Sequence, residues 1–172
     1  KNYRNSKQIL KAASHLANKY GEEAKRQGVE IEVLDPELAE RETSKPLAIE
    51  VKEGDEIAAA YQLAKDCLNV GSAIPWAICI ATASPDELPI KKIIANKPQD
   101  FPVQVDALTG DYNRNRDSMT VGSIADVKGF EFAMIIIVGC GAKMLPPTNG
   151  CSEECWRHAL RLYVAMTRGR DQ

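Results

Sequence analysis

The sequence predicts an α/β protein in which a mostly parallel sheet lies between layers of helices, as a three-layer sandwich. Residues 77–81 and 134–138 are almost wholly apolar, which is typical of strands that are buried on both faces of a sheet. Segments with helical spacing of apolar residues alternate with such runs along the chain. Alternating strands and helices favour parallel strands joined by helical crossovers.

The first predicted helix spans residues 6–20. Ser6 is a suitable N-cap, and apolar residues recur after it at helical spacing. Either Gly21 or Gly28 would end this helix, because glycine is common just beyond a helix C-terminus. A short strand is predicted next, at residues 47–51.

A second helix is predicted to begin near Asp55 and a third to span residues 85–97, with Pro85 in its first turn. The inward face of the second helix is predicted to carry Ile57, Ala60, Ala64, Cys67 and Leu68. Residues 103–107 fit a further strand. Residues 109–118 are polar and rich in turn formers, which predicts a loop.

Two more strands are predicted at residues 119–124 and 134–138, followed by a last helix at residues 151–170. Glu153 and Glu154 lie in the first turn of that helix, where the helix dipole favours negative charge. We therefore expect one domain over residues 1–172. The chain starts at a residue other than Met and ends in a charged, helix-like stretch, so we expect it to be cut from a larger protein.

Composition narrows the possible classes of protein. The net charge of −2 does not mark the whole surface for nucleic acid, so DNA binding would need a local basic patch. No apolar run approaches the roughly 20 residues of a membrane helix. Five cysteines at irregular spacing favour free thiols in a cytoplasmic protein over a disulfide framework.

Three segments carry residues suited to chemistry. Residues 2–6 place an aromatic ring beside an arginine, a pair that can stack on a base and reach a phosphate. Residues 128–132, Lys-Gly-Phe-Glu-Phe, put charges between two core strands, although a surface turn explains this element equally well. Residues 163–170 alone fit an amphipathic helix with a basic C-terminus.

Taken together and in order, these segments resemble the motifs of one family. Residues 2–6 resemble motif IV of the UvrD/Rep-type superfamily 1 DNA helicases, residues 120–132 resemble motif V, and residues 153–168 resemble motif VI. The resemblance runs from end to end of the chain. It implies the second, C-terminal RecA-like motor domain of such a helicase, a P-loop NTPase fold without its own P-loop.

In that family, ATP binds between two RecA-like domains, and the first supplies the P-loop and the residues that hold Mg²⁺. No G-x-x-x-x-G-K-[ST] occurs in this sequence, as expected for the second domain. The resemblance therefore implies ATP and Mg²⁺ as cofactors. It implies single-stranded DNA and the first motor domain as partners, and DNA repair in a bacterial cytoplasm or nucleoid. The isolated fragment is expected to be inactive.

The resemblance also implies roles at the ATP site. Arg4 and Arg168 would be arginine fingers that approach the γ-phosphate, because guanidinium groups stay charged and match phosphate geometry. Tyr3 would stack on the adenine. Lys128 and Gly129 would shape the turn between the ATP and DNA sites, with Gly129 beside the nucleotide. Glu131 would accept a hydrogen bond from the ribose or otherwise lie at the nucleotide.

On the DNA side, the resemblance implies contacts from Ser123 and Lys128. The family usually has Thr-x-His before the Lys-Gly of motif V, whereas this chain has Ser123 and Ala125. Ser123 keeps a hydroxyl that can reach a DNA phosphate, but Ala125 cannot. Residues 81–83 also lack the Arg and Asn that the family often places near DNA. The loop at 109–118 is too short for the large subdomain that many members carry there.

Two other interpretations remain open. One is a degenerate helicase-like module that binds DNA or a partner without motor activity. The other is a generic α/β binding domain with accidental motif matches, in which Arg4, Glu131 and Arg168 would lie far apart.

Two further features are interpreted conservatively. Cys151, Cys155 and His158 share a helical face, but a structural zinc site needs four ligands, so no metal site is predicted. Residues 37–42 are interpreted as a solvated, mobile acidic segment.

Overall fold

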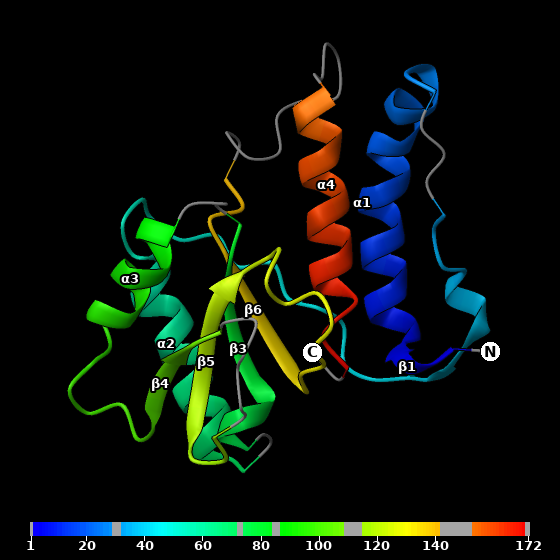
Figure 1. Cartoon of the computed structure of the whole chain (residues 1–172). Helices are drawn as coiled ribbons and strands as arrows, with labels where there is room; N and C mark the ends of the chain where they lie inside the picture. The colour runs from blue at the N-terminus through cyan, green and yellow to red at the C-terminus, as the bar shows by residue number, and fades with distance from the viewer. Residues whose placement is uncertain are drawn as a thin grey trace.

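The structure is a computed structural model, drawn in Figure 1. It describes residues 2–28, 32–71, 74–83, 87–108, 115–141 and 153–170. At residues 2–4, 87 and 88 only the backbone is described.

Within these residues the helices and strands alternate along the chain. In order they are β1 (Asn2–Ser6), α1 (Lys7–Arg26), the 3-10 helix Pro36–Leu38, β2 (Ala39–Arg41), α2 (Glu56–Asn69), the 3-10 helix Pro75–Ala77, β3 (Ile78–Thr82), α3 (Glu87–Ala95), β4 (Gln104–Ala107), β5 (Ser118–Ser123), β6 (Met134–Val138) and α4 (Glu153–Met166).

Four of the strands form one parallel sheet in the order β4-β5-β3-β6. β3 lies between β5 and β6, and all five of its residues are buried. The predicted α/β class with a parallel sheet is therefore confirmed. β1 and β2 form a separate, two-stranded parallel sheet.

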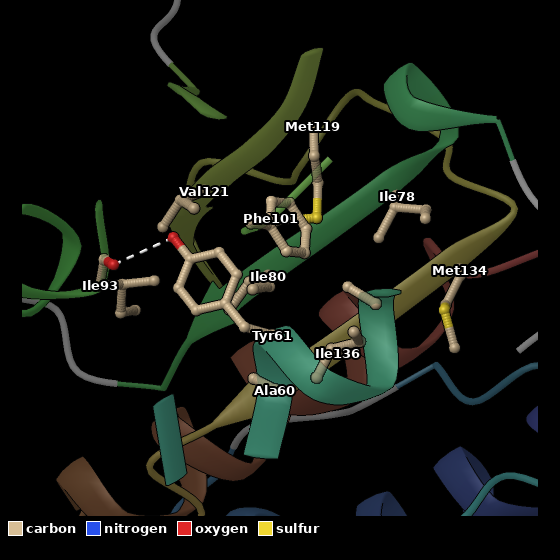
Figure 2. Packing of buried hydrophobic residues seen from close by; sticks show 11 residues of the cluster. Ala60, Tyr61, Ile78, Ile80, Ile93, Phe101, Met119, Val121, Met134 and Ile136 are labelled. Atoms are coloured by element: carbon tan, nitrogen blue, oxygen red, sulfur yellow. Dashed lines mark hydrogen bonds between the residues drawn. The ribbon is translucent and has the colours of Figure 1, made fainter. Parts of the chain in front are cut away.

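One face of the larger sheet packs against α2 and α3. Because side chains alternate along a strand, Ile78 and Ile80 of β3 point to this face. Tyr61 of α2 lies over them; its hydroxyl donates a hydrogen bond to the carbonyl oxygen of Ile93 at 3.0 Å (Figure 2). The ring of Tyr61 also meets Phe101 edge to face, with centroids 5.0 Å apart. This is the main apolar core of the described residues.

The opposite face carries the smaller side chains Cys79 and Ala81, which pack against Val127, Phe132 and Ala165. Ala165 belongs to α4, which lies side by side with α1 (Figure 1). Figure 1 shows this helix pair on the other side of the sheet from α2 and α3. Helices therefore lie on both sides of the parallel sheet.

The first predicted helix is confirmed, with a longer extent than expected. The Ser6 side chain accepts a hydrogen bond from the N–H of Ile9 at 3.3 Å, as an N-cap does. Gly21 lies inside the helix. Gly28, at φ +76°, follows the C-cap Gln27 and is the correct choice of the two predicted ends.

The predicted strand at residues 47–51 is wrong. Leu47 and Ile49 are 74% and 58% exposed, and no strand in the described part of the chain pairs with them. An alternating apolar pattern becomes a strand only where a neighbour supplies hydrogen bonds, so the pattern alone was insufficient.

The interpretation of residues 37–42 as mobile is also wrong, because β2 forms there and pairs with β1. Glu37 forms ion pairs with Lys7 and Lys11 of α1. Gln8 accepts a hydrogen bond from the N–H of Thr43 at 3.0 Å. β1 itself was not predicted: of residues 2–6, only Ser6 was assigned to an element, as the N-cap of the first helix.

The remaining predicted elements are found with small shifts at their ends. Of the predicted loop, residues 109–114 lie outside the described residues, and Ser118 already begins β5. Among the helices that the structure describes, none combines the length and the apolar content that membrane crossing needs.

Replacing Tyr61 tests the main core. Tyr61→Phe keeps the packing but removes the hydroxyl bonded to the Ile93 carbonyl. We expect the free energy of unfolding to fall by about 1 kcal/mol, measured by urea denaturation at pH 7. An unchanged free energy would show that this hydrogen bond contributes nothing net.

We also expect the difference in stability between wild type and Tyr61→Phe to depend on pH. Burial raises the pKa of Tyr61 to about 12, above the ordinary value of 10.0. Stability from the neutral phenol is full below pH 10 and is lost as the pH rises towards 12, because the unfolded chain ionises first. The stability advantage of wild type over Tyr61→Phe should therefore shrink over that range, and a constant difference would contradict the assignment.

Candidate functional site

The end of β1 is joined to the residues that follow α4. The side chain of Asn5 is 2% exposed. Its amide nitrogen donates to the carbonyl oxygen of Thr167 at 2.7 Å and to that of Gly169 at 2.9 Å. Residues more than 160 positions apart are thus in direct contact.

The segment at residues 128–132 also contacts the residues that follow α4. The N–H of Phe132 donates to the carbonyl oxygen of Arg168 at 3.0 Å, and the N–H of Arg170 donates to the carbonyl oxygen of Phe132 at 2.8 Å. Phe132 and Gly169 form an isolated parallel bridge. We call the meeting point of Asn5, Phe132 and residues 167–170 the junction.

The junction satisfies main-chain carbonyls just beyond the end of α4. The last carbonyls of the helix itself accept hydrogen bonds from residues 167–169, so the carbonyls of those three residues need donors from elsewhere. Here residues 167, 168 and 169 each offer a carbonyl oxygen, and each receives an N–H from a distant segment. Leaving one such buried group unpaired costs about 1–3 kcal/mol.

Arg168 lies in the middle of the junction. Its side chain is partly buried, and its Nε is buried without a hydrogen-bond partner among the described residues. A guanidinium stays charged in proteins, and a buried donor without an acceptor is unfavourable. The geometry therefore leaves a charged donor suited to an anionic acceptor.

Residues 124–132 connect this junction to the far end of the sheet. Ser123 is level with Thr82 and Val138 at the carboxyl end of the strands. Met134 is level with Ile78 at the amino end. The segment between Ser123 and Met134 must cross the length of β3, about 13 Å at 3.3 Å per residue.

This crossing segment is packed onto the sheet rather than looped away from it. Ile124, Val127 and Phe132 are buried against the face that carries Cys79 and Ala81. Gly129 has φ +99°, a conformation that other residues rarely adopt, and the space around its Cα is open. Lys128 and Glu131 are exposed on the same segment.

The structure brings some of the predicted ATP-site residues together. Glu131 directly precedes Phe132, and Arg4 directly precedes Asn5, so their backbones meet at the junction beside Arg168. The side chains of Tyr3 and Arg4 lie outside the described part of the structure. The hydrogen bonds at the junction are those of Asn5 and Phe132, the chain neighbours of Arg4 and Glu131.

The junction lies away from the usual ligand position of a parallel sheet, which is beyond the carboxyl ends of the strands. Phe132 instead lies just before β6, at the amino end of the sheet. The hydrogen bonds of residues 167–170, just beyond α4, decide this position.

Ser123 lies at the opposite, carboxyl end, and its hydroxyl is occupied. It is 4% exposed; the hydroxyl donates to the Asp126 carboxylate at 2.7 Å and accepts from the N–H groups of Ala125 and Asp126 at 3.2 Å. A phosphate contact from Ser123 would have to displace these bonds. Lys128 is exposed and is the more accessible of the two predicted DNA contacts.

Sequence reasoning named the segment that contains Asn5 but assigned that residue no role. The only signal in the sequence was that an asparagine amide carries two N–H donors, and every asparagine shares this property. No group of three or more metal-ligating side chains occurs among the described residues. Cys155 is disulfide-bonded, which corrects the expectation that all five cysteines are free thiols.

No family model matches the chain, and no curated protein matches it significantly. Its function is therefore inferred from its residues and their geometry.

Gly129→Ala tests the positive-φ turn of the crossing segment, where alanine would be strained. The added methyl meets no atom within 4 Å, so the expected loss of about 1–2 kcal/mol in unfolding free energy comes from backbone strain alone. Gly21→Ala is the matched control, because Gly21 is helical and equally uncrowded. The control should gain about 0.5–1 kcal/mol. Equal changes in unfolding free energy for both variants, measured by urea denaturation, would contradict the predicted backbone strain at residue 129.

Proposed function

We propose that this chain is the second, C-terminal RecA-like motor domain of an ATP-dependent UvrD/Rep-type DNA helicase or translocase. The observation that carries the proposal is the junction, where the three motif-like segments meet around Arg168, whose Nε has no acceptor in the described part of the chain. A parallel α/β sheet with helices on both sides is compatible with a RecA-like sandwich.

On this proposal, Arg168 and Arg4 are arginine fingers that act across a cleft on ATP bound to the first motor domain. ATP, with Mg²⁺ held mainly by that first domain, supplies the phosphoryl group that is transferred to water. The fingers stabilise the charge that develops on the phosphoryl oxygens, an effect of about 10³–10⁵ in rate. Tyr3, Gly129 and Glu131 lie on the nucleotide side.

Coupling to DNA would run through the crossing segment. Lys128 contacts the phosphate backbone of single-stranded DNA, while Ser123 contacts it only when its turn with Asp126 opens. Because the segment from Ile124 to Phe132 is packed along the sheet, movement at one end displaces the other. Closure of the cleft on ATP would in this way alter the grip on DNA, as a ligand-biased domain closure.

A second candidate is a degenerate helicase-like module that binds DNA or a partner without motor activity. The occupied hydroxyl of Ser123 and the absence of a side-chain donor at Ala125 favour it. The buried Nε of Arg168, which has no acceptor among the described residues, favours the motor, because a site without a ligand has no use for an unsatisfied charged donor.

The test is DNA-stimulated ATPase activity of the parent protein, comparing wild type with Arg168→Ala. We expect stimulation of wild type and a loss of about 10³-fold or more in turnover for Arg168→Ala, with nucleotide binding retained. Arg157→Ala is the matched control: it removes an exposed arginine of α4 that pairs with Glu153 and lies over the ring of Trp156, with no hydrogen bond to the junction among the described residues. This control should retain nearly full activity.

Two results would favour the second candidate instead: no stimulation of wild type by DNA, or full turnover by Arg168→Ala. The isolated chain should show no ATP turnover, because it lacks a P-loop. ATPase activity in a pure preparation of the isolated chain would contradict the division of the site between two domains.

A further inference from the structure

The main chain around Arg168 is held from two directions. Asn5 of β1 binds the carbonyls on either side of it, at Thr167 and Gly169. Phe132 binds the carbonyl of Arg168 itself and receives the N–H of Arg170. The backbone that carries the guanidinium therefore has few ways to move without breaking these bonds.

Asn5 is chemically suited to this arrangement. A side-chain amide nitrogen carries two N–H donors, so one atom can reach two carbonyl oxygens. A serine hydroxyl would offer one donor, and an ionised aspartate none. Both donors of Asn5 are used, at 2.7 and 2.9 Å.

The backbone next to Asn5 is also held in place by the surrounding elements. The next residue, Ser6, caps α1 and is paired with Arg41 of β2. α1 in turn packs along α4 through Tyr20 and Ala24 against Trp156 and Ala159. The position of Asn5 relative to the α4 end is therefore set by packed helices as well as by its own hydrogen bonds.

We propose that Asn5 is a positioning residue that locks the Arg168 main chain against β1 and so sets the spacing between Arg4 and Arg168. The restraint of the Arg168 main chain, which we call the lock, follows from the hydrogen bonds. Its role in holding Arg4 and Arg168 at one phosphate rests on the proposed function. Because transition-state stabilisation depends on donors placed to within an ångström, such a lock acts on turnover more than on binding.

Amide hydrogen exchange of the 172-residue chain tests the lock without reference to ATP. Asn5→Leu keeps the size of the side chain but removes both donors. The amides of Phe132 and Arg170 should then exchange at least about tenfold faster, while those of Ala83 and Ile124, which are bonded within the sheet, should change much less. Equal acceleration at all four amides, or none at the junction, would overturn the proposal.

Two more variants complete the experiment. Asn5→Ser keeps one donor and should give an intermediate acceleration at Phe132 and Arg170, and it serves as the test if Asn5→Leu does not fold. Asn96→Leu is the matched control, because the Asn96 amide donates to a backbone carbonyl, that of Lys92 at 2.8 Å, on an exposed helix end. It should leave the junction amides unchanged; acceleration there would count against a local role of Asn5.

The purpose of the lock is tested separately by ATPase kinetics of the parent protein. Asn5→Leu should lower kcat by about 10²-fold and change KM for ATP by less than about threefold, with Asn5→Ser in between. A loss confined to KM would overturn the positioning role. If hydrogen exchange shows the lock but Arg168→Ala keeps full turnover, the proposed function fails and the lock stands.

Discussion

The structure depends on one requirement, which is that the main-chain carbonyls of residues 167–169, just beyond α4, obtain hydrogen-bond donors. No further helical turn follows to provide these donors, and water has little access to buried carbonyls. Asn5 and Phe132 supply them, from segments near the start of the chain and before its last strand. Hydrogen bonding of ordinary backbone groups thus brings three charged segments together, and among the described residues the Nε of Arg168 has no acceptor.

A segment packed on the sheet connects this junction to the opposite end of the strands. The face that carries Cys79 and Ala81 has small side chains, so residues 124–132 can lie close against it. The other face, filled by Ile78, Ile80 and Tyr61, has no room for such a segment because α2 and α3 occupy it. The difference in side-chain size between the two faces of β3 therefore decides which face the crossing segment packs against. This segment leads from Ser123 at the carboxyl end of the strands to Phe132 near the amino end.

Local patterns predicted much of the fold. The helix that begins at Ser6 and the buried strands β3 and β6 could be recognised because capping and hydrophobic periodicity act within a few residues. Residues 47–51 and 37–42 were assigned wrongly for a common reason. Whether an extended segment becomes a strand depends on a partner far away in the sequence, and β1 pairs with Ala39–Arg41 rather than with the more apolar segment.

The amino-acid sequence by itself determined the α/β class, the order of most elements and the three segments that carry the candidate chemistry, because each is encoded in neighbouring residues. Only the tertiary structure decided that these segments meet, that they do so at the amino end of the sheet, and that Asn5 joins them. It also decided that the Ser123 hydroxyl is occupied by Asp126. These facts depend on hydrogen bonds between groups that become neighbours only when the chain has folded, and no local pattern specifies such partners.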